Sequence, residues 1–153
     1  MLPILKNESG ETLYGADYVF EYGKADLIRT GDALALIVTG TPIGRAMKAI
    51  ARLRDEGVFV QLWYVSSPLE IDTEMLATAV KTGQIITVED HNVHSGMGSI
   101  IAEKLIELKL CCNLTKLGVR DYPVSGNSED VYQWACLDTQ SIINKIKELI
   151  GHK

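Results

Sequence analysis

The chain has 153 residues, 46% of them hydrophobic and 23% charged, a balance that favours one soluble globular domain with a sizeable core. Its net charge is −5 and its 15 lysine and arginine residues are scattered, which argues against a nucleic-acid or anionic-membrane partner. No apolar run approaches the roughly 18 residues that cross a bilayer, and residues 1–7 lack the regions of a signal peptide. We therefore expect a cytoplasmic protein.

Apolar patterns predict a regular alternation of strands and helices. Residues 1–16 show little periodicity and are expected to form a linker or lead-in segment, so the domain should cover residues 17–153. Strands are expected at residues 24–29, 34–38, 58–65, 85–88 and 114–119. Helices are expected over residues 43–55, from Asp72 to Gly83, over about 100–108, and from Asp138 to Gly151. This alternation predicts a three-layer α/β domain with a mostly parallel sheet.

Two local signals add detail. Thr41 should cap the first helix, with Pro42 at its first position. The cysteines Cys111 and Cys112 are adjacent, where a mutual disulfide would be strained, and Cys136 is isolated. We expect reduced, partly buried thiols and neither a disulfide framework nor a metal-ligand spacing.

The most informative segment follows the apolar run at residues 85–88. It passes through polar and glycine residues into an amphipathic stretch, and so predicts a strand, a polar loop and a helix. In an open parallel sheet, ligands and partners collect at the carboxyl ends of strands, where backbone N–H groups and the helix dipole point. The candidate interface or anion site comprises Glu89, Asp90, His91, His94, Ser95, Gly96, Gly98 and Ser99. In the competing interpretation, Ser95 or Ser99 caps the helix and the loop satisfies its own backbone.

A catalytic or metal site in this loop is the less favoured alternative. The two histidines, with Glu89, Asp90 and Ser95, include the residue types of nucleophilic, acid–base or metal chemistry. However, they lie on one short loop, whereas catalytic groups normally converge from separate segments. We therefore assign no catalytic, cofactor-binding or metal-binding residue to the chain. Elsewhere, Ser125-Gly126 is expected to be a turn, and Arg120 and Asp121 to form a local ion pair.

A family resemblance rests on motifs spread along the chain. In order, these are Tyr22-Gly23-Lys24-Ala25, Arg29-Thr30-Gly31-Asp32, Thr39-Gly40, Glu89-Asp90-His91, Gly96-Met97-Gly98-Ser99, Gly118-Val119-Arg120-Asp121-Tyr122 and Ser125-Gly126. From about Leu2 to Ile150 the chain resembles the C-terminal domain of transketolases, particularly the C-terminal section of two-subunit transketolases. The resemblance implies a five-stranded mixed sheet with four parallel strands and an antiparallel first strand at an edge. One departure is Leu69-Glu70-Ile71-Asp72, where the family usually has Lys-Pro-Leu-Asp.

The resemblance also implies that the catalytic site lies in other domains of the enzyme. The assembled enzyme uses thiamine diphosphate and Mg²⁺ to transfer a two-carbon ketol unit between sugar phosphates. The family's Gly-Asp-Gly run with a downstream Asn, and its activating glutamate, belong to the two preceding domains, and Gly31-Asp32 here lacks the following glycine. We therefore expect a chain that is inactive alone and binds no cofactor alone. Its expected partners are the N-terminal transketolase domains or subunit, in a homodimeric enzyme.

Two alternatives remain open. The same domain is the C-terminal domain of 1-deoxyxylulose-5-phosphate synthases and of the beta subunits of 2-oxoacid dehydrogenases, so the chain could belong to either. In the latter, the domain would help bind the acyltransferase core. The other alternative is a non-enzymatic regulatory α/β module.

Overall fold

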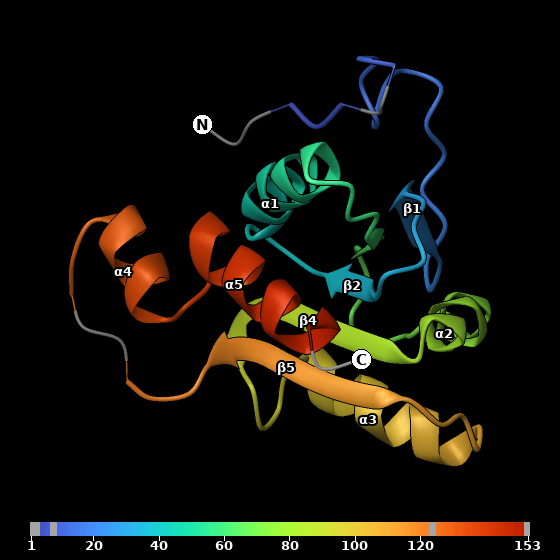
Figure 1. Cartoon of the computed structure of the whole chain (residues 1–153). Coiled ribbons are helices and arrows are strands. Elements are labelled where there is room, and N and C mark those ends of the chain that lie inside the picture. The colour runs from blue at the N-terminus through green and yellow to red at the C-terminus, as the bar shows by residue number, and fades with distance from the viewer. Residues whose placement is uncertain (1–3, 7–8, 123–124, 152–153) are drawn as a thin grey trace.

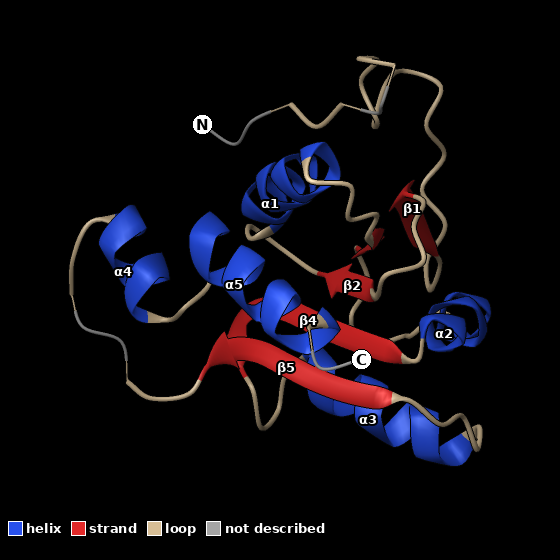
Figure 2. Ribbon diagram, in the orientation of Figure 1, coloured by secondary structure: helices blue, strands red, loops and turns tan. Residues whose placement is uncertain are grey.

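The computed structural model describes residues 4–6, 9–122 and 125–151. Five strands and five α-helices form the described chain (Figures 1 and 2). In chain order they are β1 (Ala25–Arg29), β2 (Ala35–Val38), α1 (Ile43–Asp55), β3 (Gln61–Val65), α2 (Thr73–Ala79), β4 (Gln84–Asn92), α3 (Met97–Glu107), β5 (Asn113–Val119), α4 (Ser128–Trp134) and α5 (Thr139–Ile150), with a short 3₁₀ turn at Val80–Thr82 after α2. No helix in the described part of the chain is both long and apolar enough to cross a membrane.

The sheet has the order β1-β3-β2-β4-β5. β1 pairs antiparallel with β3 at one edge, and the other neighbours pair in parallel, which confirms the expected mixed sheet. One apolar core lies between the sheet and helices α1 and α5, and contains Leu36, Leu53 and Ile142. The second core lies on the other face, under α2 and α3, and contains Ile37, Met75 and Ile101. The three-layer α/β/α architecture is therefore confirmed.

Several predicted boundaries were wrong. β4 does not end at residue 88 but continues to Asn92, so Glu89 and its neighbours lie in a strand and not in a loop. β3 begins only at Gln61, because residues 58–60 are irregular chain. Helix α1 begins at Ile43 after Pro42, and no side chain caps it, so the expected Thr41 cap is absent. Helix α4 was not predicted at all.

The cysteines only partly match the prediction. All three are free thiols, and Cys112 is half-buried, as expected. Cys111 and Cys136 are exposed, so the expectation of burial was wrong for these two. Cys111 lies in the turn between α3 and β5, and Cys136 lies in the turn between α4 and α5, outside both apolar cores.

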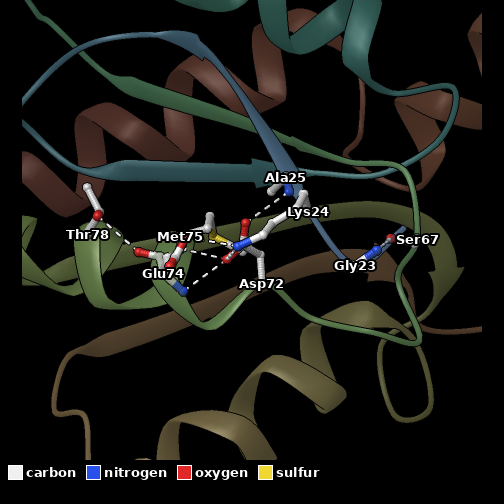
Figure 3. A network of polar contacts seen from close by, with 8 residues as sticks. All are labelled: Gly23, Lys24, Ala25, Ser67, Asp72, Glu74, Met75 and Thr78. Carbon is white, nitrogen blue, oxygen red and sulfur yellow. Dashed lines mark hydrogen bonds and ion pairs between the residues drawn. The ribbon is translucent and has the colours of Figure 1, made fainter. Parts of the chain in front are cut away.

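A network of polar contacts fastens the start of β1 to the start of α2 (Figure 3). The Asp72 carboxylate caps α2 as predicted, accepting from the backbone N–H groups of Glu74 at 2.9 Å and Met75 at 3.2 Å. Its other oxygen accepts from the N–H of Ala25, the first residue of β1, at 3.1 Å. Lys24 adds an ion pair to Glu74 at 2.8 Å. A single carboxylate thus joins a helix cap to the antiparallel edge strand.

This double role predicts an unusually costly cap substitution. Losing an N-cap side chain lowers the free energy of unfolding by about 0.5–2 kcal/mol. Asp72→Ala should cost roughly 1 kcal/mol more than that, because the N–H of Ala25 also loses its acceptor. Asp138→Ala is the matched control, since Asp138 caps α5 through Gln140 and Ser141 without touching a strand. Urea unfolding of both variants measures the difference, and equal losses would contradict the prediction.

Candidate functional site

The parallel strands β2 and β4 end side by side, and the chain leaves them in opposite directions. After β2 it turns into α1, which packs on one face of the sheet, and after β4 it turns into α3 on the other face. Such a divergence opens a crevice at the carboxyl end of an α/β sheet, where ligands commonly bind. The residues predicted from the sequence lie along the β4 side of this point.

Glu89 is fully buried at the N-terminus of α3. Its Oε2 accepts from the N–H of Met97 at 2.6 Å, and its Oε1 accepts from the N–H of Gly98 at 2.8 Å. The Nδ1 of His91 lies 3.4 Å from the same Oε2. A negative group was expected at this helix N-terminus, because the dipole and the free N–H groups favour one. The chain supplies that group itself.

Gly96, just before α3, leaves space for the Glu89 carboxylate, and Gly98, in the first turn of α3, leaves space for Thr87 and Lys116. A Cβ atom at Gly96 would lie 2.1 Å from Glu89 Oε2, and a Cβ at Gly98 would lie 2.5 Å from Thr87 Oγ1. Gly96 is the N-cap residue of α3 and has no side chain that could cap the helix. The close approach of α3 to β4 therefore requires glycine at both positions.

The two serines do not cap α3, so the expected serine cap was wrong. The other part of the competing interpretation is confirmed, because Glu89 and Asn92 accept from backbone N–H groups of the same segment. Ser95 is exposed. The Ser99 hydroxyl donates to the carbonyl of Val93 at 2.9 Å, and accepts from Lys116 Nζ at 3.0 Å. Lys116 also donates to the Val93 carbonyl at 2.7 Å. Ser99 therefore ties the loop to β5.

Asp90 points into a different cluster, at the crevice itself. Its Oδ2 accepts from the Tyr132 hydroxyl of α4 at 2.8 Å. The guanidinium of Arg45 lies 3.7 Å from the centre of the Tyr132 ring, and it pairs with Glu129 at 2.5 Å. Burial raises the pKa of the Tyr132 hydroxyl, and the hydrogen bond to Asp90 raises it further. Tyr132 is therefore a neutral hydrogen-bond donor that joins α4 to Asp90 of β4.

This α4 cluster was missed from the sequence. The helix has a local signal, because the Asn127 side chain accepts from the N–H of Asp130 at 3.1 Å and two acidic residues occupy its first turn. Ser125-Gly126, predicted to be a turn, is irregular chain shortly before that cap. The expected ion pair between Arg120 and Asp121 was wrong within the described residues, since Arg120 donates instead to the carbonyl of Lys116 at 3.2 Å.

The eight predicted residues therefore separate into groups. Glu89, Gly96, Gly98 and Ser99 build the junction of β4, α3 and β5, and Asp90 faces α4. His91, His94 and Ser95 are exposed, and the N–H of His94 donates to the Asn92 side chain at 2.8 Å. Within the described ranges, no three His, Cys, Asp or Glu residues are grouped so that they could hold a metal ion.

Two of the hollows at this end of the sheet lie beside the starts of α1 and α3. The larger, about 620 Å³, lies between the lead-in segment and the start of α1, and its walls include Leu5, Tyr14, Ile43 and Tyr64. Burial and the nearby Asp26 carboxylate raise the pKa of the Tyr14 hydroxyl, so it stays protonated near neutral pH. The smaller hollow, about 330 Å³, lies between the loop after β3 and the start of α3. The larger hollow has no histidine, thiol or carboxylate in its described wall.

Comparison with known proteins identifies the family. Residues 23–142 match the family model of the transketolase C-terminal domain. The chain belongs to that family. This transketolase C-terminal domain is 30% identical over 135 residues to an apulose-4-phosphate transketolase subunit of Actinobacillus succinogenes, a match that covers 86% of the chain and 43% of the relative.

Two further similar proteins show that the chain matches only part of a longer protein. The domain is 28% identical over 142 residues to the 1-deoxy-D-xylulose-5-phosphate synthase of Magnetococcus marinus, covering 88% of the chain and 22% of that protein. A split gene transketolase, solved as an inactive beta4 tetramer, has the same fold with a TM-score of 0.80 and 24% identity, over 91% of this chain and 45% of that one. The chain thus spans less than half the length of each of these proteins.

Proposed function

We propose that the chain completes a thiamine diphosphate-dependent transketolase as its C-terminal domain or subunit, with a structural and assembly role. The enzyme transfers a two-carbon ketol unit between sugar phosphates. The observation that carries the proposal is the family match over residues 23–142. The relative named a transketolase subunit supports the choice of reaction.

The chemistry of the described residues supports an assembly role over a catalytic one. Glu89, the fully buried carboxylate, is occupied by two backbone N–H groups of α3. The described residues offer no metal-binding cluster for a magnesium diphosphate. The sequence has no Gly-Asp-Gly run, and we therefore assign thiamine diphosphate and Mg²⁺ to other parts of the assembled enzyme.

The proposed partners are the N-terminal transketolase domains or subunit, within a homodimeric enzyme. One relative is named as a transketolase subunit and the solved neighbour as a split gene product, and both names support a partner on a separate chain. Three exposed residues, His91 at the end of β4 and His94 and Ser95 in the loop after it, are the part of the predicted site available to that partner. A cytoplasmic enzyme fits the three free thiols.

The alternative is the C-terminal domain of a 1-deoxy-D-xylulose-5-phosphate synthase, which the Magnetococcus marinus relative favours. The two reactions differ in their carbon balance. Ketol transfer between sugar phosphates releases no carbon dioxide, whereas a reaction that begins from a 2-oxoacid loses its carboxyl group. Measuring carbon dioxide release by the assembled enzyme with pyruvate therefore separates the two functions.

The proposal predicts complete dependence on the partner. The chain alone should bind thiamine diphosphate at about millimolar affinity or weaker, and should show no ketol transfer from xylulose 5-phosphate. Adding the N-terminal domains in trans should restore turnover. Calorimetry that shows micromolar, magnesium-dependent binding to the chain alone would contradict the prediction, and so would a full complement of domains without ketol transfer.

A further inference from the structure

Exposed apolar side chains collect beside the start of β1. Scattered exposed apolar residues are normal on a protein surface, but a group of them marks an interaction site. Here the exposed fractions are high, at 83%, 55%, 67% and 79%, for the four side chains that we name the apolar ridge: Val19, Phe20, Tyr22 and Leu69.

The polar network holds the two halves of the ridge together (Figure 3). The N–H of Gly23 donates to the Ser67 hydroxyl at 2.9 Å, and a Cβ atom at Gly23 would lie 2.9 Å from Cγ of Glu70. Tyr22 therefore lies next to the loop that carries Leu69. Since Asp72 also binds the N–H of Ala25, the chain leading into β1 is fixed before any partner arrives, which lowers the entropic cost of binding.

The ridge continues towards the exposed end of β4. Leu69 and Pro68 form one wall of the 330 Å³ hollow, and His91 and Met97 lie on its other side. β1 runs antiparallel, and its first residue Ala25 pairs with Val65 at the carboxyl end of β3. The ridge, the hollow and His91 are thus all at the carboxyl end of the parallel strands.

The surroundings of the ridge are acidic. Residues 8–23 contain four Asp or Glu and no Lys or Arg. Asp17, Glu21 and Glu70 are exposed at its edge. Two cations lie nearby and both are paired: Lys24 with Glu74 at 2.8 Å and Asp72 at 3.9 Å, and Lys104 with Glu107 at 2.8 Å. The rim therefore carries an excess of negative charge around an apolar centre.

The charge argues against a second copy of this chain as the occupant. In a two-fold symmetric dimer the same patch of each copy meets its partner, so two acidic rims would face one another at a cost. We propose that the apolar ridge docks against an apolar surface with a basic rim on the thiamine diphosphate-binding portion of the assembled transketolase. This inference rests on the proposed function, and names the surface through which the chain takes part in it.

The first test removes the apolar centre. The full chain with Phe20→Ser and Leu69→Ser is titrated against the separately expressed thiamine diphosphate-binding portion, with calorimetry and ketol transfer as readouts. The dissociation constant should rise at least about tenfold, since exposed aromatic anchors dominate such interfaces. Ile106→Ser is the matched control, because Ile106 is 79% exposed at the far end of α3, away from the ridge. The control should bind like the wild type.

The second test removes the charge. Glu21→Gln with Glu70→Gln should weaken binding and flatten its dependence on salt, because rim charges steer association and are screened by ions. Thermal unfolding should be unchanged in this variant. If the wild type assembles and both ridge variants assemble equally well, the inference is wrong while the proposed function stands. A wild-type chain that never assembles with the catalytic portion overturns both.

A third outcome concerns a second copy. If light scattering shows that the chain alone forms a dimer, and Phe20→Ser with Leu69→Ser abolishes it, the ridge serves self-association. That result would overturn the proposed occupant without affecting the assignment of the fold.

Discussion

Replacing Glu89 with alanine is expected to lower the free energy of unfolding by roughly 3 kcal/mol or more. The substitution removes a buried carboxylate that accepts hydrogen bonds from the N–H groups of Met97 and Gly98. Hydrogen bonds to a charged group contribute about 1.5–3 kcal/mol each, and buried donors left without an acceptor add a further penalty. Guanidinium unfolding followed by circular dichroism measures the loss.

Two control variants define the cause. Glu89→Gln keeps the size of the side chain but offers one carbonyl oxygen and one NH₂ group to two N–H donors, so its loss should be intermediate. His91→Ala removes the imidazole that lies beside the Glu89 carboxylate. The His91 side chain is 54% exposed, so this substitution should change the free energy of unfolding little. A loss below about 1 kcal/mol for Glu89→Ala would show that water or a neighbour replaces the carboxylate.

The elements that the sequence predicted well carry their signals locally. The apolar run at residues 34–38 belongs to a central strand covered on both faces, and four of its residues form β2. Asp72 and Asp138 cap their helices through N–H groups two and three residues later. Each of these interactions closes within a few residues, so the pattern alone contains it.

The elements that were missed depend on distant partners. A strand was not expected to continue through Glu89, because charged side chains are rarely buried unless paired, and the groups that pair it belong to α3. Asp90 meets Tyr132 across 42 positions of sequence, and the contact joins α4 to the end of β4. The apolar periodicity of either segment does not predict contacts between residues so far apart in the sequence.

The candidate site stays a prediction, and one of its physical features could be read from the sequence. A negative group at the start of α3 follows from the helix dipole, whereas its source could not be read from the pattern. With Glu89 in that position, the N–H groups of Met97 and Gly98 are already occupied. The segment therefore offers a partner the exposed His91 of β4 and the exposed His94 and Ser95 of the following loop, and not an open helix N-terminus.

Gly96→Ala should destabilise the domain by about 2–4 kcal/mol, combining overpacking with disturbed hydrogen bonds. The backbone at Gly96 has φ of −85°, which alanine adopts freely. The cost is therefore steric, because the new methyl group would lie 2.1 Å from Oε2 and 2.6 Å from Cδ of Glu89. Gly126→Ala is the matched control, since its nearest neighbour would be Val131 at 3.7 Å, and its effect should stay within about 0.5 kcal/mol.

The double variant Glu89→Ala with Gly96→Ala tests whether the two positions act as one unit. Once the carboxylate is gone, the methyl group at position 96 enters the space it vacated, so Gly96→Ala should add little to the loss already caused by Glu89→Ala. Residues in direct contact show coupling energies of about 0.5–3 kcal/mol, and here the coupling should lie near the upper end. Unfolding of the four proteins in the cycle measures it. If the two losses simply add, the glycine is needed for some reason other than room for the buried carboxylate.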